Sequence, residues 1–142
     1  SSAASDVYKR QIRNRARSFV YSTAPPPMLA RAAVASIALV QNADEARASL
    51  LANAERMRSG LRALGYDVPA GSSQILPVLI GPNDRTMALS AKLLDRGVFV
   101  QGIRPPTVPE GTSRLRLTAM ATHQPEQIER ALGAFASVRD IR

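Results

Sequence analysis

Apolar side chains recur at helical spacing near the middle of the chain. Between Ala46 and Leu64 they lie three or four residues apart, and Gly65 follows the last of them. This spacing places them on one face of a helix, and a glycine at that point favours a helix end. Asn42 and Glu45 have the spacing of a capping box. The pattern predicts a long amphipathic helix that begins near Asn42 and ends at Gly65.

The opposite face of this predicted helix is charged. Its charged side chains are those of Glu45, Arg47, Glu55, Arg56, Arg58 and Arg62. Charges on such a face usually stay hydrated, so we interpret it as a solvated face in preference to a binding stripe.

The segment from Met28 to Val40 is apolar on nearly every side. The prolines Pro25 to Pro27 precede it, and a helix cannot run through them. A helix without a polar face is typical of one that is buried against other protein. We therefore expect a helix over 28–40 that further protein covers.

The rest of the chain combines short segments of strand character with segments of helical spacing. Strands are predicted over 75–80, 98–103 and 114–118, and helices over 85–96 and after Thr122, which we expect to cap the last helix. The apolar face of that last helix consists of Ile128, Ala131, Phe135 and Val138. This order predicts an α+β unit in which helices cover a small sheet.

Composition limits the chemistry that the chain can carry. It has 142 residues, enough for one ordinary domain, with one His and no Cys. Disulfides, cysteine-bound metals, thiol nucleophiles and multi-histidine sites are therefore excluded within this chain, and we expect no metal. No apolar segment has the ~20 residues of a membrane span. We predict a soluble, cytoplasmic protein with no membrane partner.

The net charge of +8 raises nucleic acid as a partner, but the distribution of charge argues against it. The first 17 residues carry five basic side chains and one acidic one, which accounts for half of the net charge. Aromatic residues make up 4% of the chain, too few for the stacking platforms of single-strand binders. We expect no nucleic-acid partner, and a basic stripe of Arg56, Arg58 and Arg62 is the alternative.

Three parts are expected along the chain. Residues 1–11 are polar and fit no predicted element, so we interpret them as a leader foreign to the protein. Residues 12–41 form a linking segment that includes the buried helix. Residues 42–142 form the α+β domain.

Residues 102–118 are the most informative about chemistry. Prolines and glycines stiffen the loop before the last predicted strand, as in loops that hold backbone against a ligand. Arg114 and Arg116 alternate with leucines, which places both guanidinium groups on one face of that strand. A guanidinium is suited to grip a carboxylate through two parallel hydrogen bonds. Ion pairing with Glu110 or Glu126 is the alternative.

Three further polar residues give weaker signals. Ser22 and Thr23 precede the prolines, and they either cap the following helix or bind an anion near its start. His123 lies near a helix start, where we expect a local hydrogen-bond partner in preference to an acid or base. No nucleophile–base set or phosphate-binding glycine loop can be identified from the residues.

The string GIRPPTVPEGTSRLRLTAMATH closely resembles the C-terminal domain of the 8-amino-7-oxononanoate synthases. These are pyridoxal-phosphate α-oxoamine synthases of the fold type I aminotransferase superfamily. ARSFVYSTAPPP is similar to the family's segment after the cofactor lysine, so the resemblance runs from about Ile12 to the C-terminus. It implies the C-terminal small domain of such an enzyme: a small, mostly antiparallel sheet covered by helices and preceded by long helices.

The resemblance also implies a reaction and its site. L-alanine would condense with a pimeloyl thioester of coenzyme A or acyl carrier protein, giving 8-amino-7-oxononanoate, carbon dioxide and the free thiol in biotin biosynthesis. Pyridoxal phosphate would act as the electron sink. By the family's pattern Arg116 would hold the amino-acid carboxylate and Thr107 would contact substrate. Ser22 and Thr23 would reach the cofactor phosphate of the neighbouring subunit in a homodimer.

One departure from the family's pattern concerns the cofactor lysine. Neither Lys9 nor Lys92 has the glycine-flanked context expected of the Schiff-base lysine. The resemblance therefore implies a C-terminal fragment whose large domain lies N-terminal to Ile12, without a catalytic residue of its own and inactive alone. A glycine-using α-oxoamine synthase and a non-catalytic interaction module are the alternatives.

Overall fold

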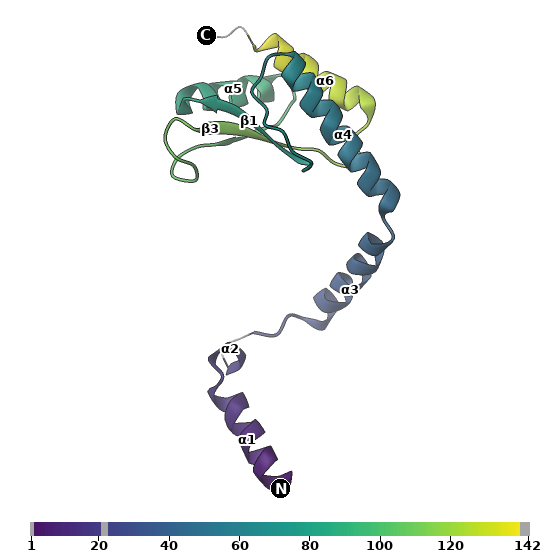
Figure 1. Cartoon of the computed structure of the whole chain (residues 1–142), viewed down its shortest axis with the longest axis vertical. Coiled ribbons are helices and arrows are strands. Elements are labelled where there is room, and N and C mark those ends of the chain that lie inside the picture. The colour runs from purple at the N-terminus through teal and green to yellow at the C-terminus, as the bar shows by residue number, and fades with distance from the viewer. Residues whose placement is uncertain (1, 21–22, 140–142) are drawn as a thin grey trace. The chain divides into compact units, whose positions relative to one another are not determined.

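The computed structural model describes residues 2–20 and 23–139, which form two compact units (Figure 1). The described residues up to Asn42 belong to the first unit, and those from Ala43 onward belong to the second. The helices are α1 (Ser2–Arg15), α2 (Arg17–Val20), α3 (Pro27–Gln41), α4 (Asp44–Ala63), α5 (Asn83–Asp95) and α6 (Pro125–Ser137). The strands are β1 (Ile75–Gly81), β2 (Gln101–Ile103) and β3 (Ser113–Thr118).

The first unit is helical. α3 confirms the helix predicted over 28–40, and Pro27 occupies its first turn, where an amide hydrogen is not needed. No residue of α3 is buried. Its exposed large apolar side chains are those of Met28, Leu29, Val34, Ile37, Leu39 and Val40. α1 gives residues 2–11 a helical conformation that we did not expect, and their interpretation as a foreign leader stays a prediction.

The second unit is a two-layer α+β domain, which confirms the predicted fold class. Its sheet has the order β1-β3-β2 with both pairings antiparallel. Leu76 lies opposite Leu117 and Val78 opposite Leu115, and all four side chains are buried on one face. α4, α5 and α6 lie over that face (Figure 1), and their apolar residues complete the core around Phe135.

The opposite face of the sheet carries the alternate residues of β3. Arg114 is half-buried and Arg116 is exposed, while Leu115 and Leu117 between and beyond them are buried. Side chains of a strand alternate between its two faces, so both arginines belong to the face opposite to the buried leucines, as predicted.

The second strand is shorter than predicted. Residues 98–100 lie outside β2, so the prediction of a strand from Val98 is wrong. Their backbone is engaged by α5: the amide of Val98 donates to the carbonyl of Leu93 (2.9 Å), and the carbonyl of Val100 accepts the Ser90 hydroxyl (2.6 Å). The hydrogen bonds with α5 therefore use backbone groups of Val98 and Val100 that would otherwise pair with a neighbouring strand.

Both predicted side-chain caps are wrong. The Asn42 side chain donates backward to the carbonyl of Ala38 (3.0 Å), and α4 begins without a side-chain cap. The cap of α6 is Gln124, which forms a reciprocal capping box with Gln127. Thr122 lies two residues earlier, where its hydroxyl is not in the cap position.

Glycines end α4 and α5 as predicted. Gly65 and Gly97 have φ values of 80° and 74°, a left-handed conformation that glycine adopts at little cost. After Gly65 the amide of Tyr66 donates to the carbonyl of Leu61 (3.0 Å), and Val98 makes the corresponding bond after Gly97. These bonds satisfy the last free carbonyls of each helix and turn the chain back toward the sheet.

Two other glycines lie inside helices and form a matched pair for a stability test. A Cβ added at Gly133 of α6 would meet nothing within 4 Å, whereas one at Gly60 of α4 would lie 2.5 Å from a methyl carbon of Leu132. We expect Gly133→Ala to raise the free energy of unfolding by about 0.5–1 kcal/mol, because alanine has the higher helix propensity. Gly60→Ala should lose that gain because Leu132 must move. Urea unfolding of both variants tests this, and equal gains would contradict the close α4–α6 contact.

Candidate functional site

Arg116 lies at the wall of a hollow of about 450 Å³ on the β2 side of the domain. The wall combines the end of β3, the segment that precedes β2, the loop before α6, part of α6 and one residue of α4. Its larger apolar side chains include Met57, Phe99 and Met120, and no acidic residue is among those that line it.

The guanidinium of Arg116 has no partner of its own in the described ranges 2–20 and 23–139, where it makes neither an ion pair nor a hydrogen bond. The alternative of pairing with Glu110 or Glu126 is therefore wrong for this structure. Arg114 is engaged differently, because its Nε donates to the carbonyl of Thr112 (3.0 Å). Arg116 is thus left available to an anion from outside the domain.

Thr107 lies in the loop between β2 and β3, and its side chain is exposed. The loop is held by its own hydrogen bonds: the amide of Thr107 donates to the carbonyl of Arg104 (3.1 Å), and the hydroxyl of Thr112 donates to the carbonyl of Pro109 (2.7 Å). Through Thr112 the Arg114 side chain supports the same loop. Thr107 and Arg116 therefore share one hairpin, although no hydrogen bond joins them in the described structure.

The predicted cofactor-phosphate contacts fall in the first unit. Ser22 lies outside the described residues. Thr23 is exposed between α2 and α3, and α3 starts after Pro26 without a side-chain cap. The capping alternative is therefore wrong for Thr23, and its contact with phosphate stays a prediction.

The His123 side chain makes a local hydrogen bond, as we predicted: its Nδ1 accepts the amide N–H of Met120 (3.2 Å). The carbonyl oxygen of His123 also accepts the side-chain amide of Asn53 (3.0 Å), and this bond connects the loop before α6 to α4.

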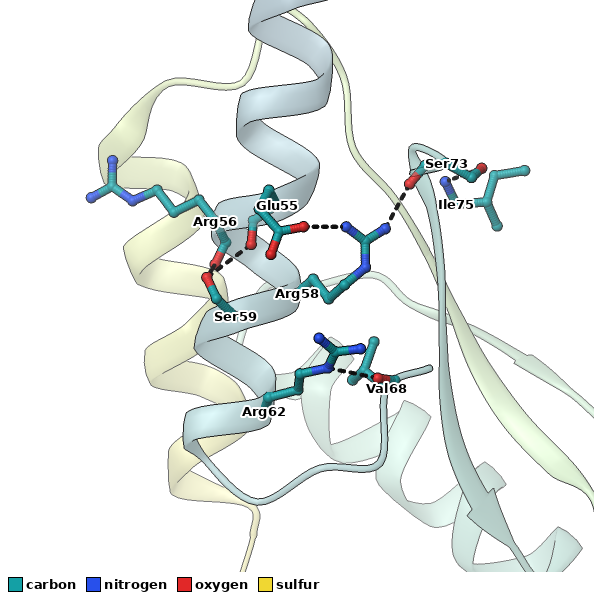
Figure 2. Close-up of polar contacts among 8 residues, drawn as sticks. All are labelled: Glu55, Arg56, Arg58, Ser59, Arg62, Val68, Ser73 and Ile75. Atoms are coloured by element: carbon teal, nitrogen blue, oxygen red, sulfur yellow. Dashed lines mark hydrogen bonds and ion pairs between the residues drawn. The ribbon is translucent and has the colours of Figure 1, made fainter. Parts of the chain in front are cut away.

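Arg58 is not part of a solvated face, which corrects that prediction (Figure 2). Its side chain is 5% exposed and donates to Glu55 (2.6 Å) and to the carbonyl of Ser73 (2.9 Å). Arg62 donates from Nε to the carbonyl of Val68 (2.8 Å). Both arginines bind the segment between α4 and β1 to the helix. Helical spacing could not indicate this, because their partners are carbonyls of an irregular segment.

Arg56 completes the set of arginines that we considered for nucleic acid. It pairs with Glu129 of α6 (2.8 Å), and both side chains are about half exposed. All three arginines of that stripe thus have intramolecular hydrogen bonds, and Arg56 and Arg58 also pair with carboxylates.

A second hollow of about 630 Å³ lies on the β1 side of the domain. Asp67, Asp84, Arg85 and Lys92 are among the residues that line it. Lys92 also lines this second hollow, and it is not among the residues that line the hollow containing Arg116.

Two absences apply to the described residues only. No three potential ligands among their His, Asp and Glu side chains gather into a possible metal site. No helix in the same ranges has both the length and the apolar character required to cross a bilayer.

The second unit is thus a helix-covered antiparallel sheet whose central strand carries an arginine without a partner among the described residues. The chain belongs to the aminotransferase class I and II family, whose model matches residues 2–135. This confirms the family resemblance and, with the solved structures below, the fold.

Curated relatives that the chain matches include 8-amino-7-oxononanoate synthases. The chain is 46% identical over 127 residues to the synthase of Citrifermentans bemidjiense and 45% identical over 138 residues to that of Trichlorobacter lovleyi. The alignments cover 88% and 96% of this chain but 33% and 35% of the relatives. The chain thus spans about a third of the length of these relatives.

Solved structures agree on the fold. Serine palmitoyltransferase from S. paucimobilis with bound PLP–myriocin has a TM-score of 0.81 and 32% identity, covering 92% of this chain and 33% of that one. 8-Amino-7-oxononanoate synthase from Francisella tularensis has a TM-score of 0.73 and 23% identity, covering 92% and 38%. The family and the first of these structures imply pyridoxal phosphate as the cofactor.

Proposed function

We propose that the chain forms the C-terminal part of a pyridoxal-phosphate-dependent 8-amino-7-oxononanoate synthase, which condenses L-alanine with a pimeloyl thioester. The observation that carries this proposal is the 46% identity to a curated synthase over 88% of the chain. The unpaired Arg116 in a hollow without acidic groups supports it, because the reaction requires an anchor for the carboxylate of the amino acid.

In this proposal the chain's own residues bind and orient the substrates. Arg116 holds the carboxylate of alanine through its guanidinium. Thr107 contacts substrate from the loop that Thr112 and Arg114 brace. A stiff loop keeps that contact in place without an ordering cost when the substrate binds.

The described residues provide only part of a cofactor site, namely a contact for its phosphate. Thr23 offers an exposed hydroxyl for the phosphate, together with Ser22, and the proposal places both against the cofactor of a neighbouring subunit. When bound, pyridoxal phosphate withdraws electrons from the reacting carbon of the amino acid. Because neither Lys9 nor Lys92 has the glycine-flanked context expected of the Schiff-base lysine, we propose that the lysine that carries the cofactor lies outside these 142 residues. The 142-residue chain is then inactive by itself.

The complete protein is proposed to be a homodimer. The exposed apolar side chains of α3 support this, because so apolar a helix requires cover by protein. The cytoplasmic location expected from the sequence stays a prediction.

The second candidate is another α-oxoamine synthase. It is favoured by the serine palmitoyltransferase structures, which are more similar to this chain than the solved synthase is, at 32% against 23% identity. The acyl carrier, coenzyme A or a carrier protein, is open in both candidates.

The first experiment is to sequence the source DNA upstream of the Ile12 codon and to express the full-length protein that it encodes. We expect a preceding domain with a glycine-flanked lysine, and thiol release from a pimeloyl thioester that requires both L-alanine and pyridoxal phosphate. Mass spectrometry should identify 8-amino-7-oxononanoate as the product. Turnover with glycine or serine but not alanine would favour the second candidate. A start codon and an in-frame stop just upstream would favour an interaction module.

A further inference from the structure

We propose that the hollow that contains Arg116 also binds the distal carboxylate of the acyl donor, with Arg130 as its anchor. The inference rests on the proposed function and extends it to the specificity for the acyl chain. Arg130 is on α6 and lines the same hollow as Arg116. Like Arg116, it is exposed and has no ion pair or hydrogen bond within the part of the chain that the structure describes.

The polar groups of the hollow are suited to an anion. Besides Arg116 and Arg130 they include His123 and Gln127, and no Asp or Glu contributes to the wall. The Nδ1 of His123 accepts the Met120 amide, so the ring proton is on Nε2, which can donate. The Oε1 of Gln127 accepts the Gln124 amide (2.9 Å), which leaves its NH₂ group as a donor. The hollow therefore combines two arginine cations with further hydrogen-bond donors.

The remaining wall is suited to an alkyl chain. Met57, Phe99, Met120 and Ala131 contribute apolar surface, and 75% of Phe99 and 51% of Met120 are exposed to solvent. Burial of methylene groups against such side chains is favourable because it removes apolar surface from water. Methionine and an exposed aromatic ring adapt readily to a flexible chain.

Two substrate carboxylates match the two unpaired arginines of the hollow. The proposed reaction brings together the carboxylate of alanine and the distal carboxylate of the pimeloyl group, which are separated by an alkyl chain. Arg116 on β3 serves the first and Arg130 on α6 the second. The wall of the second hollow, by contrast, has Asp67 and Asp84 beside its basic residues, so carboxylates of the protein already lie near those cations. An acyl donor without a distal carboxylate would leave Arg130 without a partner.

The experiment compares two thioesters in the full-length enzyme: pimeloyl-CoA, and heptanoyl-CoA, which has the same chain length without the distal carboxylate. We expect Arg130→Gln to raise KM for pimeloyl-CoA about tenfold or more, as for loss of a charge-assisted hydrogen bond. KM for heptanoyl-CoA and KM for alanine should stay within about twofold, because neither ligand contacts Arg130 in the proposal. Arg85→Gln, an exposed helical arginine outside this hollow, is the matched control and should change neither constant.

The outcomes separate the inference from the function on which it rests. Equal KM increases for the two thioesters would overturn the carboxylate role of Arg130 and indicate a structural effect. Unchanged constants in an active Arg130→Gln enzyme would overturn it as well. A wild-type enzyme that makes no 8-amino-7-oxononanoate would instead reject the proposed function, and the binding of heptanoate and of the uncharged heptanamide to the same protein then tests the hollow alone. Equal shifts of the Arg130 side-chain NMR signal by both compounds would contradict recognition of a carboxylate.

Discussion

Arg116→Ala should raise KM for L-alanine about 100-fold or more in the complete enzyme, while KM for the thioester changes little. The structure gives the physical reason: the guanidinium is exposed, lines the hollow and has no partner among the described residues. All of its hydrogen-bonding capacity is thus available to the substrate. Steady-state kinetics with each substrate varied in turn measures the two constants separately.

Arg116→Lys is the informative companion variant. Lysine keeps the charge but lacks the planar fork that binds both carboxylate oxygens, so its KM for alanine should lie between those of wild type and Arg116→Ala. The core is not disturbed by either change, because the side chain points away from the buried Leu115 and Leu117. Equal KM increases for alanine and thioester would reject the carboxylate role of Arg116.

Periodicity allowed the sequence to predict most elements of the second unit. The three-to-four spacing up to Leu64 and the alternation of Arg114, Leu115, Arg116 and Leu117 follow from helix and strand geometry, which the structure retains. The predicted caps failed for a different reason. Asn42 and Thr122 each have neighbours that can also end or begin a helix. Local hydrogen bonds decide which of these residues forms the cap, and the choice moves the helix end by one or two residues.

The hollow could be predicted only in part. The alternation of arginine and leucine along β3 was enough to place Arg114 and Arg116 on one face of the strand. Met57, Phe99 and Arg130, however, come from distant segments that meet only after the helices pack on the sheet. Arg130 also belongs to the exposed face of α6, where a solvated cation is the usual interpretation. Only the tertiary fold shows that Arg130 lines the hollow that contains Arg116.

Arg58→Ala should lower the free energy of unfolding by about 3 kcal/mol. The side chain is 5% exposed, donates to the carbonyl of Ser73 and pairs with Glu55 (Figure 2). Its removal leaves a cavity, a carbonyl without its donor and a carboxylate without its partner. Glu55 is 62% exposed and can be rehydrated, so most of the loss comes from the contact with Ser73 and from packing. Urea unfolding of the 142-residue chain measures the change.

Arg56→Ala is the matched control, two positions earlier on the same helix. Arg56 also has an ion pair, with Glu129, but its side chain is 48% exposed and that of Glu129 is 59% exposed. Exposed ion pairs contribute little, so Arg56→Ala should lower the free energy of unfolding by about 0.5 kcal/mol.

Glu55→Gln removes the charge of the partner but keeps Arg58 in place. It should lower the free energy of unfolding less than Arg58→Ala does, because the carbonyl of Ser73 keeps its hydrogen-bond donor. The Ser73 hydroxyl accepts the Ile75 amide (3.1 Å), so a loosened Ser73 should also increase amide exchange at the start of β1. Similar losses for Arg56→Ala and Arg58→Ala, with unchanged exchange at Ile75, would show that Arg58 does not anchor this segment.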